Sequence, residues 1–261
     1  MRVVYFDCPS GASGDMILGA LVDAGVPVDA LRAELGKLPL DGWTLEARQV
    51  HRGAFRATKV DVAIGEDVDH PHRSLADVLD VLERGDLSEE IRSAATRIFT
   101  RLADAEARAH GTTPDTVRFH DVGAVDAIID VTGAVIGLTL LGADRVHVSA
   151  LPLGSGFVDG PHGRIPIPAP GTAELLRGFP VVDTGVRAEL VTPTGAAILT
   201  TLARAGGRLP AMTITAVGYG AGTRELQDTP NVLRCLVGDA AELPGRETIT
   251  QIEATIDDMS P

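Results

Sequence analysis

The positions of hydrophobic residues divide the chain into segments with strand and helix periods. Residues 3–6 form a short apolar run with β-branched and aromatic side chains, which predicts a buried strand. A stretch rich in glycine, serine and alanine follows at residues 8–14. Apolar residues then recur three or four apart from Met16 to Ala24, and a Gly-Val-Pro sequence ends this helical pattern. The N-terminus therefore predicts a strand, a Gly/Ser loop and a helix.

The rest of the chain mixes both periods. Alternating or short apolar runs predict strands at residues 43–51, 55–64, 146–149, 212–217, 231–237 and 248–256. Helical spacing of apolar residues predicts helices at residues 28–38, 73–83, 88–109, 125–141, 172–176 and 196–205. Five prolines between residues 152 and 170 predict that no regular helix begins before Thr172. This order predicts an α/β fold in which helices flank a mixed sheet.

Composition and charge narrow the classes of function. The 23 Lys and Arg residues against 36 Asp and Glu residues give a net charge of −13, which argues against nucleic-acid or anionic-membrane partners and favours cations. Aromatic residues make up only 3% of the chain, so base-stacking surfaces are not expected. No apolar stretch approaches the roughly 18 residues of a membrane span, and the two cysteines do not indicate a secreted disulfide framework. We expect a cytoplasmic protein.

The Gly/Ser loop is the first candidate site. Backbone N–H groups and hydroxyls before a helix can converge on an anion, although an ordinary tight turn has the same composition. The residues concerned are Asp7, Cys8, Ser10, Gly11, Ser13, Gly14 and Asp15. The loop lacks the Gly-Lys-Ser/Thr sequence of a P-loop, which argues against hydrolysis of a nucleoside triphosphate here. Asp15 also suits the helix dipole, and Cys8 is either a soft metal ligand or nucleophile, or a small buried thiol.

Two acidic segments are candidate metal sites. Pro71 forces His70 into an extended conformation, so His70 and His72 can face one ion. The alternative is that this segment is a solvated polar loop without a metal. Asp126 and Asp130 are four residues apart and share one helix face, which is costly for two carboxylates among apolar residues unless they are paired, protonated or metal-bound. The alternative is an acidic first helical turn that complements the dipole.

Other polar groups could complete a site. His120 lies just before Asp126 and can join an acid–base or metal cluster. Thr192 and Thr194 precede a helix, where they can either cap it or hold a phosphate. His162 lies in the proline-rich loop region. Glycines on both sides of Tyr219 indicate a closely packed backbone near a ligand or another strand.

Six segments of the chain are distinctive when taken together, and several are long and unusual in composition. The segments are FDCPSGASGDMILGALVDAG (6–25), HRSLADV (72–78), FHDVGAVDAIIDVTGA (119–134), LPLGSGFVDGPHGRIPIPAPGTAELLRG (151–178), ELVTPTGAAIL (189–199) and PNVLRCLVG (230–238). They resemble the LarC family of nickel insertion proteins, which make the nickel-pincer cofactor of lactate racemase, and this resemblance is more specific than any single motif.

The resemblance implies a nickel chelatase or insertase of the lyase class. Such a protein inserts Ni²⁺ into pyridinium-3,5-bisthiocarboxylic acid mononucleotide and consumes CTP together with Mg²⁺ or Mn²⁺. In the product, sulfurs of both thiocarboxylates and one ring carbon bind nickel. The resemblance also implies that residues 1–247 handle substrate and nickel, and that residues 248–261 begin a C-terminal domain that binds CTP. The partners to expect are the pyridinium mononucleotide and that C-terminal portion. A homo-oligomer is a further possibility.

Residue chemistry suggests roles within that reaction. His70 and His72 suit a first nickel site, although the chain has fewer histidines there than many relatives of this family. A transfer site would use His120, Asp126 and Asp130. Forming the nickel–carbon bond requires loss of a ring proton, for which the candidate bases are Asp7, Asp126 and His120. The Ser10–Gly14 loop or the Thr192–Gly195 turn would hold the substrate phosphate.

Two other functions fit the residues. A nickel metallochaperone would bind the ion and pass it on without catalysis. A metal-dependent phosphohydrolase would use the acidic clusters, and metal-dependent release of phosphate from simple esters would favour it.

Overall fold

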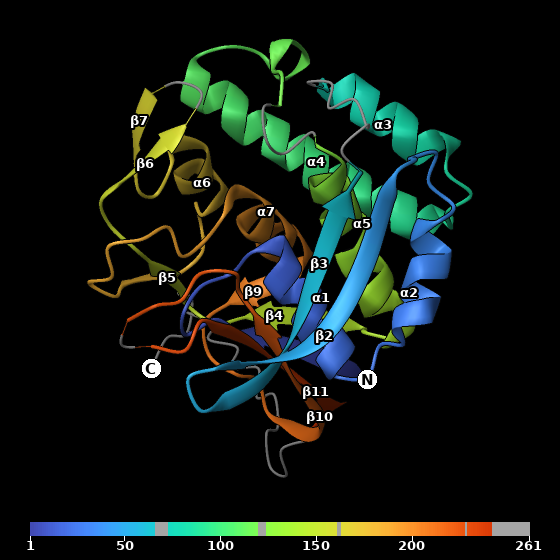
Figure 1. Ribbon diagram of the computed structural model, residues 1–261, viewed down its shortest axis with the longest axis vertical. Helices are drawn as coiled ribbons and strands as arrows, with labels where there is room; N and C mark the ends of the chain where they lie inside the picture. The colour runs from blue at the N-terminus through green and yellow to red at the C-terminus, as the bar shows by residue number, and fades with distance from the viewer. Residues whose placement is uncertain (66–72, 120–123, 161–162, 228, 242–261) are drawn as a thin grey trace, which may run out of the picture.

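A mixed sheet forms the centre of the molecule. The computed structural model describes residues 1–65, 73–119, 124–160, 163–227 and 229–241. Within these ranges, the strands of the main sheet are β1 (Arg2–Asp7), β2 (Trp43–Arg52), β3 (Phe55–Ile64), β4 (Arg145–Val148), β9 (Ala203–Gly206), β10 (Met212–Ala221) and β11 (Val232–Ala240). Their order is β2-β3-β10-β11-β1-β4-β9 (Figure 1). β1 pairs parallel with β4 and antiparallel with β11, so the sheet is mixed.

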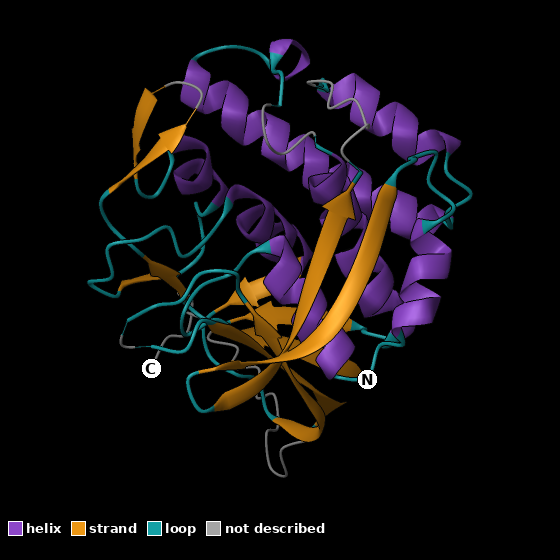
Figure 2. Ribbon diagram, in the orientation of Figure 1, coloured by secondary structure: helices purple, strands orange, loops and turns teal. Residues whose placement is uncertain are grey.

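The helices gather on one side of this sheet (Figure 2). They are α1 (Gly14–Asp23), α2 (Val28–Leu35), α3 (Leu75–Arg84), α4 (Glu89–His110), α5 (Val125–Leu140), α6 (Pro170–Leu175), α7 (Pro193–Leu202) and the short 3₁₀ helix η1 (Pro114–Thr116). α1 packs directly on β3 and β10, whereas α4 packs on α5, α6 and α7 and forms an outer layer. The main apolar core lies between the sheet and these helices.

Two glycines of β10 let α1 approach the sheet at backbone distance. A Cβ atom on Gly218 would lie 2.1 Å from the Ala20 carbonyl oxygen, and one on Gly220 would lie 1.8 Å from the Met16 carbonyl oxygen. Any side chain at these positions would push the helix away. The glycines beside Tyr219 therefore make room for a helix, which is neither the ligand nor the strand that the sequence suggested.

The predicted α/β class is confirmed, as is the N-terminal strand, loop and helix. Ser88 is the N-cap of α4, where its hydroxyl accepts a hydrogen bond from the Ile91 N–H at 3.4 Å. β2 and β3, both predicted as strands, form a hairpin whose turn contains Gly53 with a φ of +56°. Strong periodicity therefore located the long elements correctly.

The proline- and glycine-rich segment contains structure that the sequence analysis missed. The short strands β5 (Leu151–Leu153), β6 (Phe157–Gly160), β7 (Gly163–Pro166) and β8 (Val181–Asp183) form two small sheets, β5 with β8 and β6 with β7. Such strands are too short to show a period. α6 begins at Pro170 and not at Thr172, because proline is well tolerated at the first helical position.

The helix predicted at 196–205 is also misplaced. α7 begins at Pro193 and ends at Leu202, and the next residues form β9, the edge strand beside β4. The strand predicted at 248–256, and with it the proposed domain start at 248, lies outside the described residues. None of the described helices combines the length and apolar character that a bilayer span requires.

Candidate functional site

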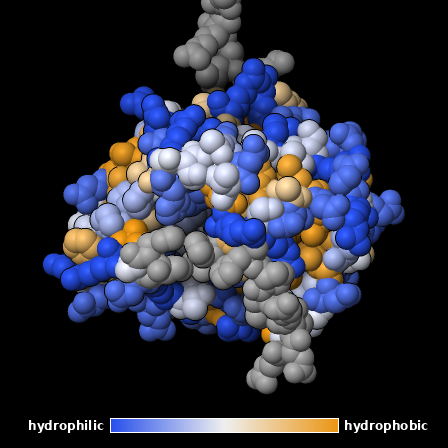
Figure 3. Space-filling model, turned by 90° about the horizontal axis from the view of Figure 1, so that it is seen from above, coloured by the Kyte–Doolittle hydropathy of each residue, from blue (hydrophilic) through white to orange (hydrophobic). Residues whose placement is uncertain are grey.

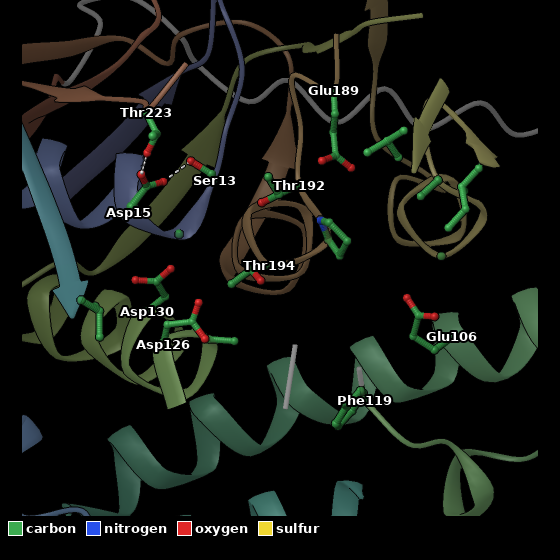
Figure 4. A pocket seen from close by; sticks show the side chains of 18 of the residues that line it. Ser13, Asp15, Glu106, Phe119, Asp126, Asp130, Glu189, Thr192, Thr194 and Thr223 are labelled. Carbon is green, nitrogen blue, oxygen red and sulfur yellow. Dashed lines mark hydrogen bonds between the residues drawn. The ribbon is translucent and has the colours of Figure 1, made fainter. Parts of the chain in front are cut away.

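A cleft of about 650 Å³ opens beside the N-terminus of α1 (Figure 4). Its walls come from α1, β3, α4, α5, α7 and the β6–β7 hairpin. The candidate residues that line it are Ser13, Gly14, Asp15, Asp126, Asp130, Thr192 and Thr194. Three segments that are far apart in the sequence, namely the Gly/Ser loop, the acidic helix α5 and the threonine turn, therefore meet around one cavity.

The Gly/Ser loop and the threonine turn are joined by backbone hydrogen bonds. The Ala12 N–H donates to the Leu190 carbonyl at 2.9 Å, and the Thr192 N–H donates to the Ala12 carbonyl at 3.0 Å. Gly11 has a φ of +137°, and a Cβ atom there would lie 2.2 Å from the Leu190 oxygen. Glycine at this position is thus required by a backbone contact between the two loops.

Both oxygens of the Asp15 carboxylate are hydrogen-bonded. Its Oδ1 accepts hydrogen bonds from the Ser13 hydroxyl and from the Met16 N–H. Its Oδ2 accepts from the Lys59 ammonium at 2.8 Å and from the Thr223 hydroxyl at 3.4 Å (Figure 4). With both oxygens engaged, Asp15 orders the start of α1 and has little capacity left for a ligand.

Asp126 and Asp130 lie next to each other on α5 below Asp15 (Figure 4). Asp126 is exposed to the cleft. Asp130 packs over Gly14, where a Cβ atom would lie 2.2 Å from its Oδ2, and its enclosed Oδ1 has no hydrogen-bond partner in the described structure. Burial, and then the Asp15 and Asp126 carboxylates, raise the pKa of Asp130 well above its usual range, while Lys59 lowers it. A buried carboxylate without a partner is costly unless a proton or a cation satisfies it.

Opposing electrostatic features meet in the cleft. The N-termini of α1, α5 and α7 open on it, and the positive ends of these helix dipoles favour an anion. Carboxylates line the cleft as well, and they are Asp15, Asp61, Glu106, Asp126, Asp130, Asp159 and Glu189. The cationic side chains among the lining residues are Lys59 and Arg118. The surface seen from above is mostly hydrophilic (Figure 3). The cleft can therefore attract a divalent cation and also hold an anionic group at a helix terminus.

Three of the predicted residues are placed away from the cleft. Val4 and Phe6 face the helices, so Asp7 points to the other face of the sheet, where its carboxylate accepts hydrogen bonds from Arg234. The Ser10 hydroxyl donates to the Pro230 carbonyl at 2.7 Å. Cys8 is buried in the core. These side chains hold the loop in place from outside the cavity.

Both cysteines are expected to be chemically inert in the folded protein. Burial raises the pKa of the Cys8 thiol and raises that of Cys235 to about 12, so neither forms a thiolate near neutral pH. Alkylation by iodoacetamide at pH 8 should be at least about a hundredfold slower than in guanidinium chloride, since only the thiolate reacts. Mass spectrometry of labelled peptides measures this, and rapid native labelling of Cys8 would contradict the buried placement.

The predicted histidines are outside the part of the chain that the structure describes, so their positions cannot be compared with the cleft. They are His70, His72, His120 and His162. Among the described residues, no group of three or more His, Cys, Asp or Glu side chains is arranged to hold a metal ion. Asp126 and Asp130 are two carboxylates, fewer than such a group requires.

Sequence reasoning missed several residues that line the cleft. Lys59 is buried on β3 and bridges Asp15 and Asp61, and Thr223 reaches Asp15 from beyond β10. Glu106 on α4 and Glu189 beside the threonine turn face the cavity from the other side (Figure 4). β3 also contains Arg56, Thr58 and Asp61, so its sequence did not single out Lys59 as a buried ammonium with acidic partners.

The sequence of this chain is similar to those of known proteins over its whole length. The chain is 49% identical over 263 residues to the "Putative nickel insertion protein" of Geotalea uraniireducens, and 46% identical over 261 residues to the protein of the same name from Citrifermentans bemidjiense. Both alignments cover 100% of this chain and 67% and 68% of those proteins, so the chain spans about two thirds of their length. No solved structure matches the chain. A family model described as nickel insertion protein matches residues 4–261. The chain therefore belongs to the nickel insertion protein family.

Proposed function

We propose that the cleft inserts nickel into pyridinium-3,5-bisthiocarboxylic acid mononucleotide, forming the nickel-pincer nucleotide of lactate racemase. The observation that carries this proposal is the meeting of two kinds of group in one cavity. Asp126 is a carboxylate exposed in the cleft, and Asp130 has an enclosed oxygen without a hydrogen-bond partner in the described structure. The N-termini of α1 and α7 present the positive ends of their helix dipoles to an anion. A reaction that joins a divalent cation to a phosphorylated ring needs both.

Nickel would bind at the α5 carboxylates. Ni²⁺ accepts oxygen, imidazole and sulfur ligands. Two carboxylates leave most of its coordination positions open, so sulfurs of the substrate can enter while the protein oxygens leave. A site with few protein ligands favours transfer over storage. His120, which precedes α5 in the sequence, would add an imidazole to this set.

The phosphate of the mononucleotide would bind at the N-terminus of α7. Thr192 caps this helix by accepting a hydrogen bond from the Gly195 N–H at 3.2 Å. Thr194 lies in the first helical turn and its hydroxyl faces the cleft (Figure 4). A helix N-terminus with an added hydroxyl donor suits a phosphate.

Formation of the nickel–carbon bond breaks a ring C–H bond, and the proton must pass to a base. Asp126 is the described candidate because it lies in the cleft and is exposed to it. Asp7 is less suited, since its carboxylate is paired with Arg234 on the other face of the sheet. The roles of His120 and Asp126 as base remain part of the proposal.

CTP with Mg²⁺ or Mn²⁺ is proposed to bind in the remaining third of the longer relatives. The chain lacks the Gly-Lys-Ser/Thr loop that holds a triphosphate in many nucleotide-binding proteins. The cleft is therefore proposed to bind nickel and the mononucleotide, and not CTP. The proposed partner is the C-terminal portion of a family member.

Reconstitution tests the proposed function. The apo-mononucleotide, Ni²⁺, CTP and Mg²⁺ are added to this chain alone and to this chain mixed with a relative's C-terminal portion, and the nickel adduct is followed by mass spectrometry. We expect product in the mixture and binding of the mononucleotide to this chain alone. Nickel binding without any binding of the mononucleotide would instead identify a metallochaperone.

A further inference from the structure

Lys59 is a buried cation at the floor of the acidic cleft. It lies on β3 with only 3% of its surface exposed. Its ammonium donates to the Asp15 Oδ2 at 2.8 Å and to the Val60 carbonyl at 2.9 Å, and it lies 2.8 Å from the Asp61 Oδ1. Three acceptors for three N–H donors satisfy the ammonium completely. Lys59 therefore has no donor left for a substrate.

The lysine changes the charge that the nickel ligands experience. Without it, Asp15 would add an uncompensated negative charge next to Asp130, whereas Asp61 would keep its ion pair with Arg48 at 3.1 Å. With it, the Asp15 charge is balanced, and Asp15 is held toward β3 by the bond to its Oδ2. The partly enclosed site transmits these charge effects more strongly than bulk water does. The affinity of the site for a doubly charged cation should therefore be lower with Lys59 than without it.

We propose that Lys59 is a positioning residue that limits nickel affinity, by neutralising Asp15 and keeping it out of the metal's ligand set, so that bound nickel can leave. This inference rests on the proposed nickel site at Asp126 and Asp130. Its characteristic consequence is that removal of the lysine tightens nickel binding while slowing transfer. A lysine with a purely structural role would weaken both when removed.

Nickel titration of matched variants tests the role of Lys59. Ni²⁺ as the chloride is titrated calorimetrically at constant ionic strength, and its transfer to a chromophoric chelator is timed. Lys59→Met should bind Ni²⁺ about tenfold more tightly and release it correspondingly more slowly, because one positive charge near the ion is lost. Lys59→Met with Asp15→Asn restores the net charge and should return the affinity to within about threefold of the unmodified chain.

Two further variants keep the test decisive if Lys59→Met does not fold. Lys59→Arg preserves the charge and should leave nickel affinity within about threefold. Asp61→Asn removes a negative charge from the same cluster and should weaken binding about threefold. Lys37→Met is the control, because Lys37 pairs with Glu34 on α2, outside the residues that line the cleft. It should change nothing.

The outcomes separate the two proposals. Tighter binding in Lys59→Met, reversed by Asp15→Asn, supports the role of Lys59. Unchanged or weaker binding in a folded Lys59→Met, or unchanged binding in Asp61→Asn, overturns it. The variant that combines Asp126→Asn with Asp130→Asn tests the nickel site itself. If this variant binds Ni²⁺ as tightly as the unmodified chain does, the proposed nickel site is wrong and the inference about Lys59 fails with it.

Discussion

Asp126→Asn combined with Asp130→Asn should reduce nickel insertion by at least about a hundredfold and abolish nickel binding in the cleft, since neutral amides are much weaker ligands than carboxylates. The two side chains share one face of α5, and the enclosed Oδ1 of Asp130 has no partner in the described structure. Calorimetric Ni²⁺ titration and adduct formation in the reconstituted mixture measure the effect. Each single variant should lose less than the pair, because one carboxylate remains.

The folded state of this double variant should be intact. Asparagine is close in shape to aspartate, and the raised pKa of Asp130 means that its charged form is already disfavoured in the protein. The midpoint temperature of thermal unfolding should therefore be unchanged or slightly higher. Asp80→Asn is a suitable control, as Asp80 pairs with Arg84 on the surface of α3. Full nickel binding by the double variant would remove the basis of the proposed site.

Gly220→Ala should destabilise the protein by about 3 kcal/mol or more, because forced overpacking has a cost of this order. The new Cβ atom would lie 1.8 Å from the Met16 carbonyl oxygen and 2.6 Å from the Ala20 nitrogen. Both are backbone atoms of α1, so no side-chain rotation can relieve the contact. Urea or guanidinium denaturation followed by circular dichroism measures the change in the free energy of unfolding.

Gly220→Ala should also change the shape of the cleft. Relief of the contact requires α1 to move off the sheet, and its N-terminus carries Ser13, Gly14 and Asp15. Gly36→Ala is the matched control, since Gly36 has an ordinary helical φ of −64° and its Cβ would lie 3.2 Å from the nearest atom. We expect the control to change stability by less than about 1 kcal/mol. Equal stability of the two variants would contradict the close packing of α1 on β10.

Long periodic elements were predictable because their apolar faces are encoded locally. The stripe on α4 and the alternation in β2 and β3 each repeat several times, so the burial of one face is visible without knowledge of the partner. The four short strands between residues 151 and 183 have three or four residues each. Their pairing depends on contacts with distant segments, and the local pattern is too brief to show it.

Candidate residues were predictable by chemistry and not by orientation. Asp7 and Asp15 flank the same loop, yet β1 alternation turns Asp7 to the far face toward Arg234, while the start of α1 directs Asp15 into the cleft. Lys59 became part of the site only because β3 runs beside α1. Which acidic residue is paired and which has no partner is decided by neighbours that are distant in sequence.

The α/β class, the N-terminal strand, loop and helix, and the family of the chain could all be inferred from the sequence, because local periodicity or contiguous residue strings carry each of them. Three properties emerged only from the folded chain: the Gly/Ser loop, α5 and the threonine turn share a cavity, Lys59 neutralises Asp15, and Asp130 has an oxygen without a partner in the described structure. These properties depend on distances between segments that lie 44 or more residues apart in the sequence. The packing of helices against the sheet sets those distances, and no local pattern records them.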